Sequence, residues 1–427
     1  MRIALLTYST RPRGGVVHTL ALAEALATAG QDVTVWTLGR GGDARFFRDV
    51  DPRVRLEVVP FVDAEGEGTG PRIVRSIGVL RTAFAGHGYD IVHAQDCISA
   101  NAVLDHARVL RTVHHIDQFT TPELAACHER AITAPAAHVC VSAAVAAELA
   151  QRWGITATVI PNGVDAARFA AAGGFAAAGG SGAGGVTTAA RHGGAVTAAS
   201  GDGDGRGGGA GAGVAAEATG DVGAADSAAA ARARWRARLG RYLLSVGGIE
   251  PRKGSIELLE AYALLRRTHP DVALVIAGGE TLFDYQPYRA RWAARAGELG
   301  VQPVVLGPVP DPDLPALVAA ADVFAFPSVK EGFGLAAMEA LAAGVPTVVS
   351  DLPVLRQVFA GAVTFADGAE GLAAALAESL DAPDPRRVEV GRALAARHTW
   401  AEAAARHLDL YRSLIGAQPA MIAEGGT

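Results

Sequence analysis

Short apolar runs alternate with longer helix-like stretches along the first part of the chain. The apolar runs predict strands, at 3–8, 33–38, 54–58, 90–94, 108–113, 138–141 and 157–160. Helices are predicted between several of them, including one at 15–29, which Gly30 ends, and one at 142–153. Strands that are apolar throughout and alternate with helices are typical of a parallel sheet covered on both faces. Residues 1–170 are therefore predicted to form one α/β domain.

The same alternation returns in the second part of the chain. Apolar runs predict strands, at 241–246, 272–277, 303–306, 322–326, 346–349 and 362–365, and the pattern at 254–267 predicts a helix. Residues 232–398 are therefore predicted to form a second α/β domain, and a cleft between two such domains is a common place for ligands. We expect the last helix-like segment, 399–416, to pack back on the first domain, which leaves 417–427 as a tail.

The segment 171–231 separates the two patterns and has a different composition. It consists mainly of Gly, Ala, Ser and Thr with scattered Asp, and Phe175 is its only aromatic residue. Such a segment cannot bury enough apolar area to offset the entropy of ordering, so we predict that it is disordered. An insertion without a function of its own is the favoured interpretation.

Composition narrows the class of protein. A chain of 427 residues suits two domains, and its net charge of −6 gives no general attraction to nucleic acid or to an anionic membrane. The three cysteines have neither a CxxC pair nor metal-ligand spacing, which favours buried thiols in a reducing compartment. The first apolar run is too short for a signal peptide, and none approaches the ~20 residues of a transmembrane helix. We therefore expect a cytoplasmic protein.

The stretch EGFGLAAME, from Glu331 to Glu339, contains the most informative chemistry. It follows an apolar run and opens a helix-like run. Gly332 and Gly334 let the backbone approach a ligand, the exposed N–H groups of a helix start bind phosphate, and carboxylates accept hydrogen bonds from hydroxyls. The alternative is one acid that complements the helix dipole and one that is solvated. The strand before and the glycines favour a site for a sugar nucleotide.

Two further motifs follow predicted strands and precede helices. In SVGGIEPRKG, Arg252 and Lys253 are suited to neutralise a diphosphate, although two adjacent basic residues on a turn are usually just solvated. In RPRGGV, Gly14 and Gly15 permit close approach of a phosphate or sugar, and a tight turn without a ligand is equally compatible. The G-x-G-x-x-G pattern is incomplete there, so the sequence gives poor support to a dinucleotide fold of the dehydrogenase type.

Histidines follow the predicted strand at 108–113. His114 and His115 would lie at the carboxyl edge of a parallel sheet, where ligands bind in such folds. A neutral imidazole at His114 is suited to hydrogen-bond a sugar hydroxyl, whereas a structural role is favoured for His115.

These four motifs, in this order, resemble the retaining glycosyltransferases of family 4. Glu331 and Glu339 match the E-x7-E motif of that family, within a close match over more than twenty positions, FPSxxEGFGLxxMEALAxGVPTV. The segment PNGVD at 161–165 resembles the one that ends the N-terminal domain there. The resemblance covers nearly the whole chain except the low-complexity segment. It implies the GT-B fold, in which two Rossmann-like parallel-sheet domains face each other across a cleft.

The resemblance also implies an activity and roles for residues. A sugar would move from a nucleotide diphosphate sugar to an unidentified acceptor hydroxyl, with retention at the anomeric carbon and without a cofactor or bound metal. Arg252 and Lys253 would stabilise the leaving diphosphate, Glu331 would bind donor sugar hydroxyls, and His114 would lie near the transferred sugar. The implied donor-binding residues, with Glu339 on the ribose, are Gly14, Gly15, Phe333, Gly334, Leu335 and Glu339.

One position departs from the family pattern. Many members have an arginine directly after the first glycine of the phosphate loop, and this chain has Gly248 there. Arg252 and Lys253 would then share the charge stabilisation. No residue matches a nucleophile for double displacement, which favours departure and attack on one face within a single ion-pair-like step. The loop 307–310 is a candidate for contact with the base by family position.

Two other functions share this architecture. An epimerase of nucleotide sugars would need no acceptor, and a non-catalytic relative would only bind the nucleotide sugar. The presence of both acids, the Arg-Lys pair and His114 argues against the non-catalytic relative.

A basic segment in the first part of the chain could contact a membrane surface, where a lipid acceptor would lie. Arg72, Arg75 and Arg81 lie among apolar residues in the helix-like run 71–84, which is compatible with peripheral contact at the inner membrane face. An ordinary surface helix of the first domain is the favoured interpretation. The sequence does not predict the donor base and sugar, the acceptor, the linkage or the oligomeric state.

Overall fold

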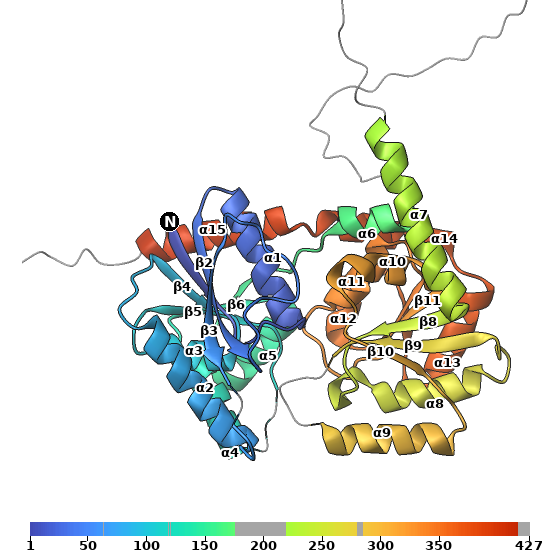
Figure 1. Cartoon of the computed structure of the whole chain (residues 1–427), viewed down its shortest axis with the longest axis horizontal. Coiled ribbons are helices and arrows are strands. Elements are labelled where there is room, and N and C mark those ends of the chain that lie inside the picture. The colour runs from blue at the N-terminus through green and yellow to red at the C-terminus, as the bar shows by residue number, and fades with distance from the viewer. Residues whose placement is uncertain (63, 118, 120, 176–218, 280–284, 417–427) are drawn as a thin grey trace, which may run out of the picture.

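The computed structural model describes residues 1–175 except 63, 118 and 120, together with 219–279 and 285–416 (Figure 1). The first domain is built on a seven-stranded parallel sheet with the order β3-β2-β1-β4-β5-β6-β7. Its strands are β1 (Arg2–Leu6), β2 (Asp32–Arg40), β3 (Arg55–Phe61), β4 (Ile91–Ala94), β5 (Val109–Val113), β6 (Ala137–Cys140) and β7 (Thr158–Val159). Its helices are α1 (Gly14–Thr28), α2 (Thr69–Phe84), α3 (Cys97–Val103), α4 (Pro122–Thr133) and α5 (Ala143–Trp153).

Alternate residues of the central strands point to opposite faces of this sheet. Ile3 and Leu5 of β1 pack in one buried cluster with α1, whereas Ala4 and Leu6 pack in another with α2 and α3. Because both faces are covered, the strands need apolar residues at every position, which explains the continuous apolar runs.

The second domain repeats this architecture with a six-stranded parallel sheet in the order β10-β9-β8-β11-β12-β13. Its strands are β8 (Arg241–Val246), β9 (Val272–Ala277), β10 (Val304–Gly307), β11 (Val323–Phe326), β12 (Thr347–Ser350) and β13 (Thr364–Ala366). Its helices are α8 (Ser255–Leu265), α9 (Gln286–Glu298), α10 (Leu314–Ala319), α11 (Leu335–Ala342), α12 (Pro353–Phe359), α13 (Gly368–Asp381) and α14 (Pro385–Arg397). The predicted α/β class with two parallel-sheet domains is therefore confirmed.

The chain passes between the two domains in two segments, one near Val164 and one near His398, and these segments are neighbours. Helix α15 (Trp400–Gly416) leaves the second domain and lies along the first, where Leu408 and Tyr411 pack in one cluster with α1 (Figure 1). The amide of Val164 donates a hydrogen bond to the carbonyl of His398 over 2.7 Å, so the two connecting segments touch. The chain therefore crosses between the domains along one narrow strip.

The domain boundary differs from the predicted one at residue 170. Helix α6 (Ala166–Gly173) packs against α10 and α11 of the second domain. Phe169, at 2% exposure, belongs to the same buried cluster as Tyr242 and Leu341. The first sheet and its helices thus end before α6, because the apolar side of this short helix is buried by the second domain.

The prediction that 171–231 is disordered is wrong at both ends of this segment, where the chain is helical. Helix α6 continues to Gly173, and helix α7 (Thr219–Leu239) begins well before residue 231, whereas 176–218 lie outside the described residues. Alanine has the highest helix propensity, so its abundance near the end of the segment favours a helix. Trp235 packs on the second domain, and Arg236 forms an ion pair with Asp322 over 2.6 Å.

The arginines of α2 contact the protein itself. Arg75 forms an ion pair with Glu67 over 2.6 Å and lies 4.1 Å from the ring centre of Phe61, and Arg81 pairs with Asp105 over 3.4 Å. These contacts favour the ordinary surface helix over a membrane contact. Among the described helices, none is long and apolar enough to cross a membrane.

Candidate active site

In each sheet the strand order reverses at one point, where the connections from two adjacent strands run in opposite directions. In the first sheet this place lies between β1 and β4, and in the second between β8 and β11. Ligands of open parallel sheets bind outside the carboxyl ends of the strands at such a switch point. The loops that follow these four strands border one cleft between the domains, with a volume of about 1800 Å³.

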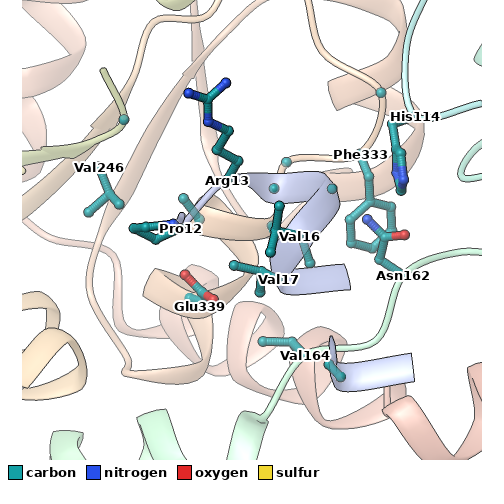
Figure 2. Close-up of a pocket in the computed structure, with 18 of the residues that line it drawn as sticks. Pro12, Arg13, Val16, Val17, His114, Asn162, Val164, Val246, Phe333 and Glu339 are labelled. Carbon is teal, nitrogen blue, oxygen red and sulfur yellow. The ribbon is translucent and has the colours of Figure 1, made fainter. Parts of the chain in front are cut away.

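All ten residues predicted for the site line this cleft. They are Gly14, Gly15, His114, Arg252, Lys253, Glu331, Phe333, Gly334, Leu335 and Glu339. Figure 2 shows Arg13, His114 and Asn162 of the first domain around the same cavity as Phe333 and Glu339 of the second.

The loops after β8 and β11 bring two cations onto one carboxylate. Glu331 Oε1 accepts hydrogen bonds from Arg252 Nη1 at 3.0 Å, from Lys253 Nζ at 2.5 Å and from Ser328 Oγ at 3.1 Å. Gly254 makes this approach possible, since its φ is +61° and a Cβ there would lie 2.0 Å from the carbonyl oxygen of Pro327. The cluster therefore depends on backbone contact between the two loops.

In this cluster the positive and negative side chains shift one another's pKa values toward the charged forms. Burial alone would raise the pKa of Glu331, but the charges of Lys253 and Arg252 lower it to about 2. Burial lowers the pKa of Lys253, and the charge of Glu331 opposes that shift. The result is two fixed positive charges and one negative charge beside an open cavity.

Glu339 has the opposite electrostatic environment. Burial raises its pKa to about 8, Asp311 and Asp165 contribute in the same direction, and Arg168 opposes them. Its side chain lies in the second turn of α11, and no hydrogen bond to its carboxyl group comes from the residues that the structure describes. The cleft is thus lined by two acids of the same motif, one with a lowered pKa and one with a raised pKa.

The start of α11 touches the first domain. A Cβ at Gly332 would lie 1.6 Å from the carbonyl oxygen of His114, so only glycine fits at this contact. Gly334 has a φ of +94°, which favours glycine directly before the helix. Phe333 is buried, and its ring centre lies 5.6 Å from that of His398. The motif therefore forms both a wall of the cleft and an interdomain contact.

His114 lies directly after β5 and faces α1. Its Nε2 is buried without a hydrogen-bond partner in the described part of the chain, and a Cβ at Gly15 would lie 3.7 Å from its ring. Burial holds its pKa well below the ordinary value, so the ring is neutral. His115 instead pairs with Asp117 over 2.8 Å. Gly14 has open space around its Cβ position, with no atom within 4 Å.

Gly248, the position that departs from the resembled pattern, is closely packed. A Cβ on Gly248 would lie 2.6 Å from the carbonyl oxygen of Gly279 and 2.7 Å from Oε1 of Glu250. A side chain there requires the loops after β8 and β9 to move apart. Pro308 and Val309, from the predicted base-contact loop, also line the cleft.

Several polar residues of the first-domain wall are absent from the sequence-based set. Gln95 and Asp96 directly follow β4, and Arg111 lies within β5. The rule that identified His114, a polar residue after a buried strand, also applies to Gln95 and Asp96. A lone charge in an apolar run was the available signal for Arg111.

The described residues include no group of three or more His, Cys, Asp or Glu side chains that could hold a metal ion.

Comparison with known families gives one match for each domain. Residues 12–168 match the family described as Glycosyltransferase Family 4, and residues 232–395 match the family described as Glycosyl transferases group 1.

Curated relatives match over part of their length. A D-inositol 3-phosphate glycosyltransferase of Corynebacterium aurimucosum is 38% identical over 177 residues, which cover 39% of this chain and 41% of the relative. The O-antigen chain mannosyltransferase B of Escherichia coli is 34% identical over 179 residues, or 40% of this chain and 46% of the relative. Each of these matches spans less than half of the relative's length.

Solved structures match over nearly the whole chain. Sucrose-phosphate synthase from Thermosynechococcus elongatus has a TM-score of 0.70 at 19% identity, covering 98% of this chain and 100% of that one. Anabaena HepE in complex with UDP-glucose has a TM-score of 0.65 at 17% identity, covering 97% and 100%. At such identities the likeness shows the shared fold, GT-B.

Proposed function

The chain belongs to the family 4 glycosyltransferases of the group 1 type, and on this premise we propose that it transfers a sugar from a nucleoside diphosphate sugar to an acceptor hydroxyl. The observation that carries this proposal is the convergence of Arg252 and Lys253 on Glu331 at the β8/β11 switch point. The UDP-glucose bound to HepE, a protein of the same fold, supports a nucleotide sugar as the donor.

In this reaction the departing diphosphate is the group whose negative charge most needs stabilisation. Charge develops on the leaving phosphate as the bond to the sugar breaks, and fixed positive groups lower the barrier. Arg252 and Lys253 supply two such groups, already held in place by Glu331. When a diphosphate arrives, it takes over as the counter-charge, and Glu331 becomes free to accept hydrogen bonds from the donor sugar.

The start of α11 supplies further binding groups. Backbone N–H groups at Gly334 and Leu335 are available to phosphate oxygens, because the first amides of a helix have no partner within it. Glu339, one turn further, is proposed to accept hydrogen bonds from the ribose hydroxyls. Phe333, Gly14 and Gly15 complete the proposed donor site.

We propose retention at the anomeric carbon without a bound metal. The bond from the anomeric carbon to the diphosphate breaks, the acceptor oxygen bonds to that carbon from the same face in one ion-pair-like step, and the acceptor's proton passes to the departing diphosphate. Arg252 and Lys253 perform the charge stabilisation that a metal ion performs in other transferases. His114, neutral and adjacent to this space, is proposed to hydrogen-bond the transferred sugar.

The proposal is tested with a thermal-shift screen of nucleoside diphosphates and their sugars on the full chain. The selected donor is then incubated with a cell extract, with and without EDTA, and release of nucleoside diphosphate is measured. We expect acceptor-dependent release that EDTA does not abolish. Conversion of the donor sugar in the absence of any acceptor would instead indicate an epimerase, and binding without turnover would indicate a non-catalytic relative.

A further inference from the structure

Two of the three cysteines lie side by side near the first-domain wall of the cleft. Cys97 is the first residue of α3, Cys127 lies within α4, and these two helices pack against each other. Both cysteines pack in one apolar cluster with Ile98 and Leu124, and their thiols are hydrogen-bonded to each other. Both are free thiols. The pair therefore arises from the packing of α3 on α4, which the spacing of cysteines along the sequence does not show.

One buried amide fixes the backbone around this pair. Asn101 Nδ2 donates hydrogen bonds to the carbonyl oxygen of Cys97 at 2.8 Å and to that of Cys127 at 2.7 Å, and it lies 3.4 Å from Cys127 Sγ. Asn101 is 3% exposed, so these bonds are shielded from water. The two cysteine residues are therefore held close together by a contact that solvent does not weaken.

The two thiols differ in access and in protonation. Cys97 is half-buried and lines the cleft, whereas Cys127 is buried within the cluster. The hydrogen bond with Cys97 raises the pKa of Cys127, and burial acts in the same direction, so Cys127 keeps its proton. Arg111 of β5 interacts electrostatically with both sulfurs. Cys97 is thus the sulfur that a small molecule in the cleft can reach, and Cys127 is a second thiol in contact with it.

An accessible cysteine in contact with a second thiol is the arrangement by which proteins respond to oxidants. We propose that Cys97 and Cys127 form a redox-sensitive dithiol, in which a peroxide oxidises Cys97 and Cys127 then closes a disulfide between α3 and α4. Where thiols are kept reduced the pair remains open, and the disulfide forms only while the oxidant is present.

The reaction consumes one peroxide for each disulfide. The Cys97 sulfur attacks one oxygen of hydrogen peroxide, the O–O bond breaks, and the products are the sulfenic acid of Cys97 and water. The Cys127 sulfur then attacks the Cys97 sulfur, the S–O bond breaks, and the departing hydroxide takes the Cys127 proton as a second water. The two thiols are oxidised by two electrons in total, and the peroxide is reduced to water.

The disulfide would alter the wall of the cleft. Two sulfurs in noncovalent contact must approach by roughly 1 Å or more to reach the bonded separation of about 2.05 Å. Cys97 directly follows Gln95 and Asp96, which line the cleft, and Asp96 Oδ1 caps α3 by accepting from the amide of Ser99 at 2.8 Å. A shift at the start of α3 therefore moves this part of the wall. Building on the proposed function, we expect the oxidised chain to transfer sugar more slowly.

The modification is tested on the full chain without any substrate. The reduced protein is treated with a small excess of hydrogen peroxide, alkylated and analysed by peptide mass mapping. We expect a peptide that joins Cys97 to Cys127 and that dithiothreitol separates. Cys140 is the internal control, because it is buried in β6 and burial raises the pKa of its thiol to about 12, so it should remain reduced.

Three variants assign the roles of the thiols. Cys127→Ala removes the second thiol, so the sulfenic acid of Cys97 should persist and react with dimedone. Cys97→Ala should give neither the disulfide nor the dimedone adduct, and Cys140→Ala should still form the disulfide. The peptide map of the wild type needs no variant, so it decides the proposal even where a substitution in the core prevents folding.

Turnover before and after oxidation measures the effect on the cleft. After removal of peroxide with catalase, the wild type and Cys140→Ala should lose turnover by roughly tenfold or more and regain it with dithiothreitol, because misplacement by about 1 Å has effects of up to 10²-fold. Turnover of Cys97→Ala should not respond to the treatment.

Three results would overturn the inference: three thiols that stay reduced, a disulfide that includes Cys140 or a second copy of the chain, or sulfinic acid at Cys97 without a disulfide. A disulfide that leaves turnover unchanged would overturn its effect on the cleft. A reduced chain that transfers no sugar would instead overturn the proposed function, while the peptide map would still decide the dithiol.

Discussion

The two acids of the EGFGLAAME motif differ in protonation because their neighbours differ. Glu331 lies within 3.0 Å of two cationic side chains, which keep it ionised despite burial. Glu339 is half-buried, which raises its pKa to about 8, and the charges of Asp311 and Asp165 add to this shift while that of Arg168 opposes it. Eight positions apart in sequence, one acid holds two cations beside the cleft and the other has a raised pKa.

Loss of the Lys253 charge should mainly reduce turnover. We expect Lys253→Ala to lower turnover by about 10²-fold or more, the scale seen when one preorganised charge-stabilising donor is removed. Steady-state release of nucleoside diphosphate measures this. Lys330→Ala is the matched control, since Lys330 is the only other lysine of the chain and only its carbonyl contacts Arg252. Near-normal turnover in Lys253→Ala would remove this residue from the mechanism.

Nucleotide affinity should depend on the ionisation of Glu339. If ribose hydroxyls donate to its carboxylate, binding favours the ionised form, so affinity should rise as the pH increases from about 7 toward the pKa of about 8 and level off above it. Glu339→Gln should bind nucleoside diphosphate more weakly and lose this pH dependence. Isothermal titration calorimetry at several pH values measures both. The same affinity and slope in the variant would exclude the ribose role.

At the scale of elements, the site is made by loops at two switch points and by one contact between the domains. The amide of Ala144, at the start of α5, donates to Gln357 Oε1 of α12 over 3.1 Å, and Gly332 lies against the carbonyl of His114. These contacts hold the start of α11 beside the end of β5. The contact between the domains and the wall of the site are therefore formed by the same segments.

A side chain at Gly332 should separate the domains without unfolding them. The Cβ of Gly332→Ala would meet the His114 carbonyl oxygen at 1.6 Å, a distance that atoms cannot adopt, so the two walls must move apart. We expect turnover to fall by roughly 10²-fold, because misplacement by about 1 Å has effects of this size, while nucleotide binding persists. Small-angle scattering should show a larger radius of gyration. Gly297→Ala, on the open surface of α9, is the control and should change neither quantity.

The sequence predicted the strands, the two domains and ten residues that line one cleft, because each signal was local. Apolar runs mark strands in a sheet covered on both faces, and polar residues directly after them mark the sheet edge. Gln95, Asp96 and Arg111 each had a local signal that the sequence analysis did not use, but their position side by side depends on the pairing of β4 with β5. Likewise, the placement of α6 in the second domain and the close packing at Gly248 depend on long-range contacts that no local pattern reports.

At the scale of the whole molecule, α15 ties the end of the chain to the first domain through buried histidines. His93 bonds Tyr411 Oη of α15 over 2.8 Å, and the ring of His18 lies 5.3 Å from Trp400 and 6.3 Å from His407. His18 also contacts His114, at 4.8 Å between ring centres. The packing of α15 is thereby connected to the wall of the cleft.

Stability should fall in mild acid because of these histidines. Burial lowers the pKa of His18 to about 3 and that of His407 to about 4, against 6.5 in an unfolded chain. The unfolded state then binds more protons below pH 6.5, so the stability present above that pH is lost as the pH falls toward 4, by up to about 1.4 kcal/mol per pH unit for each histidine. Urea unfolding between pH 7 and 5 measures this slope. His407→Gln should reduce the slope by about one proton, and an unchanged slope would contradict the assignment.

Proton NMR of the reaction tests whether the cleft transfers a sugar with retention of anomeric configuration. The full chain is mixed with the donor selected by the binding screen and an acceptor taken from the cell extract, and the anomeric signal of the first product is followed before any equilibration. We expect a new glycosidic linkage with the donor's configuration, formed in step with release of nucleoside diphosphate. A product of inverted configuration, or release of nucleotide with no new linkage, would contradict it.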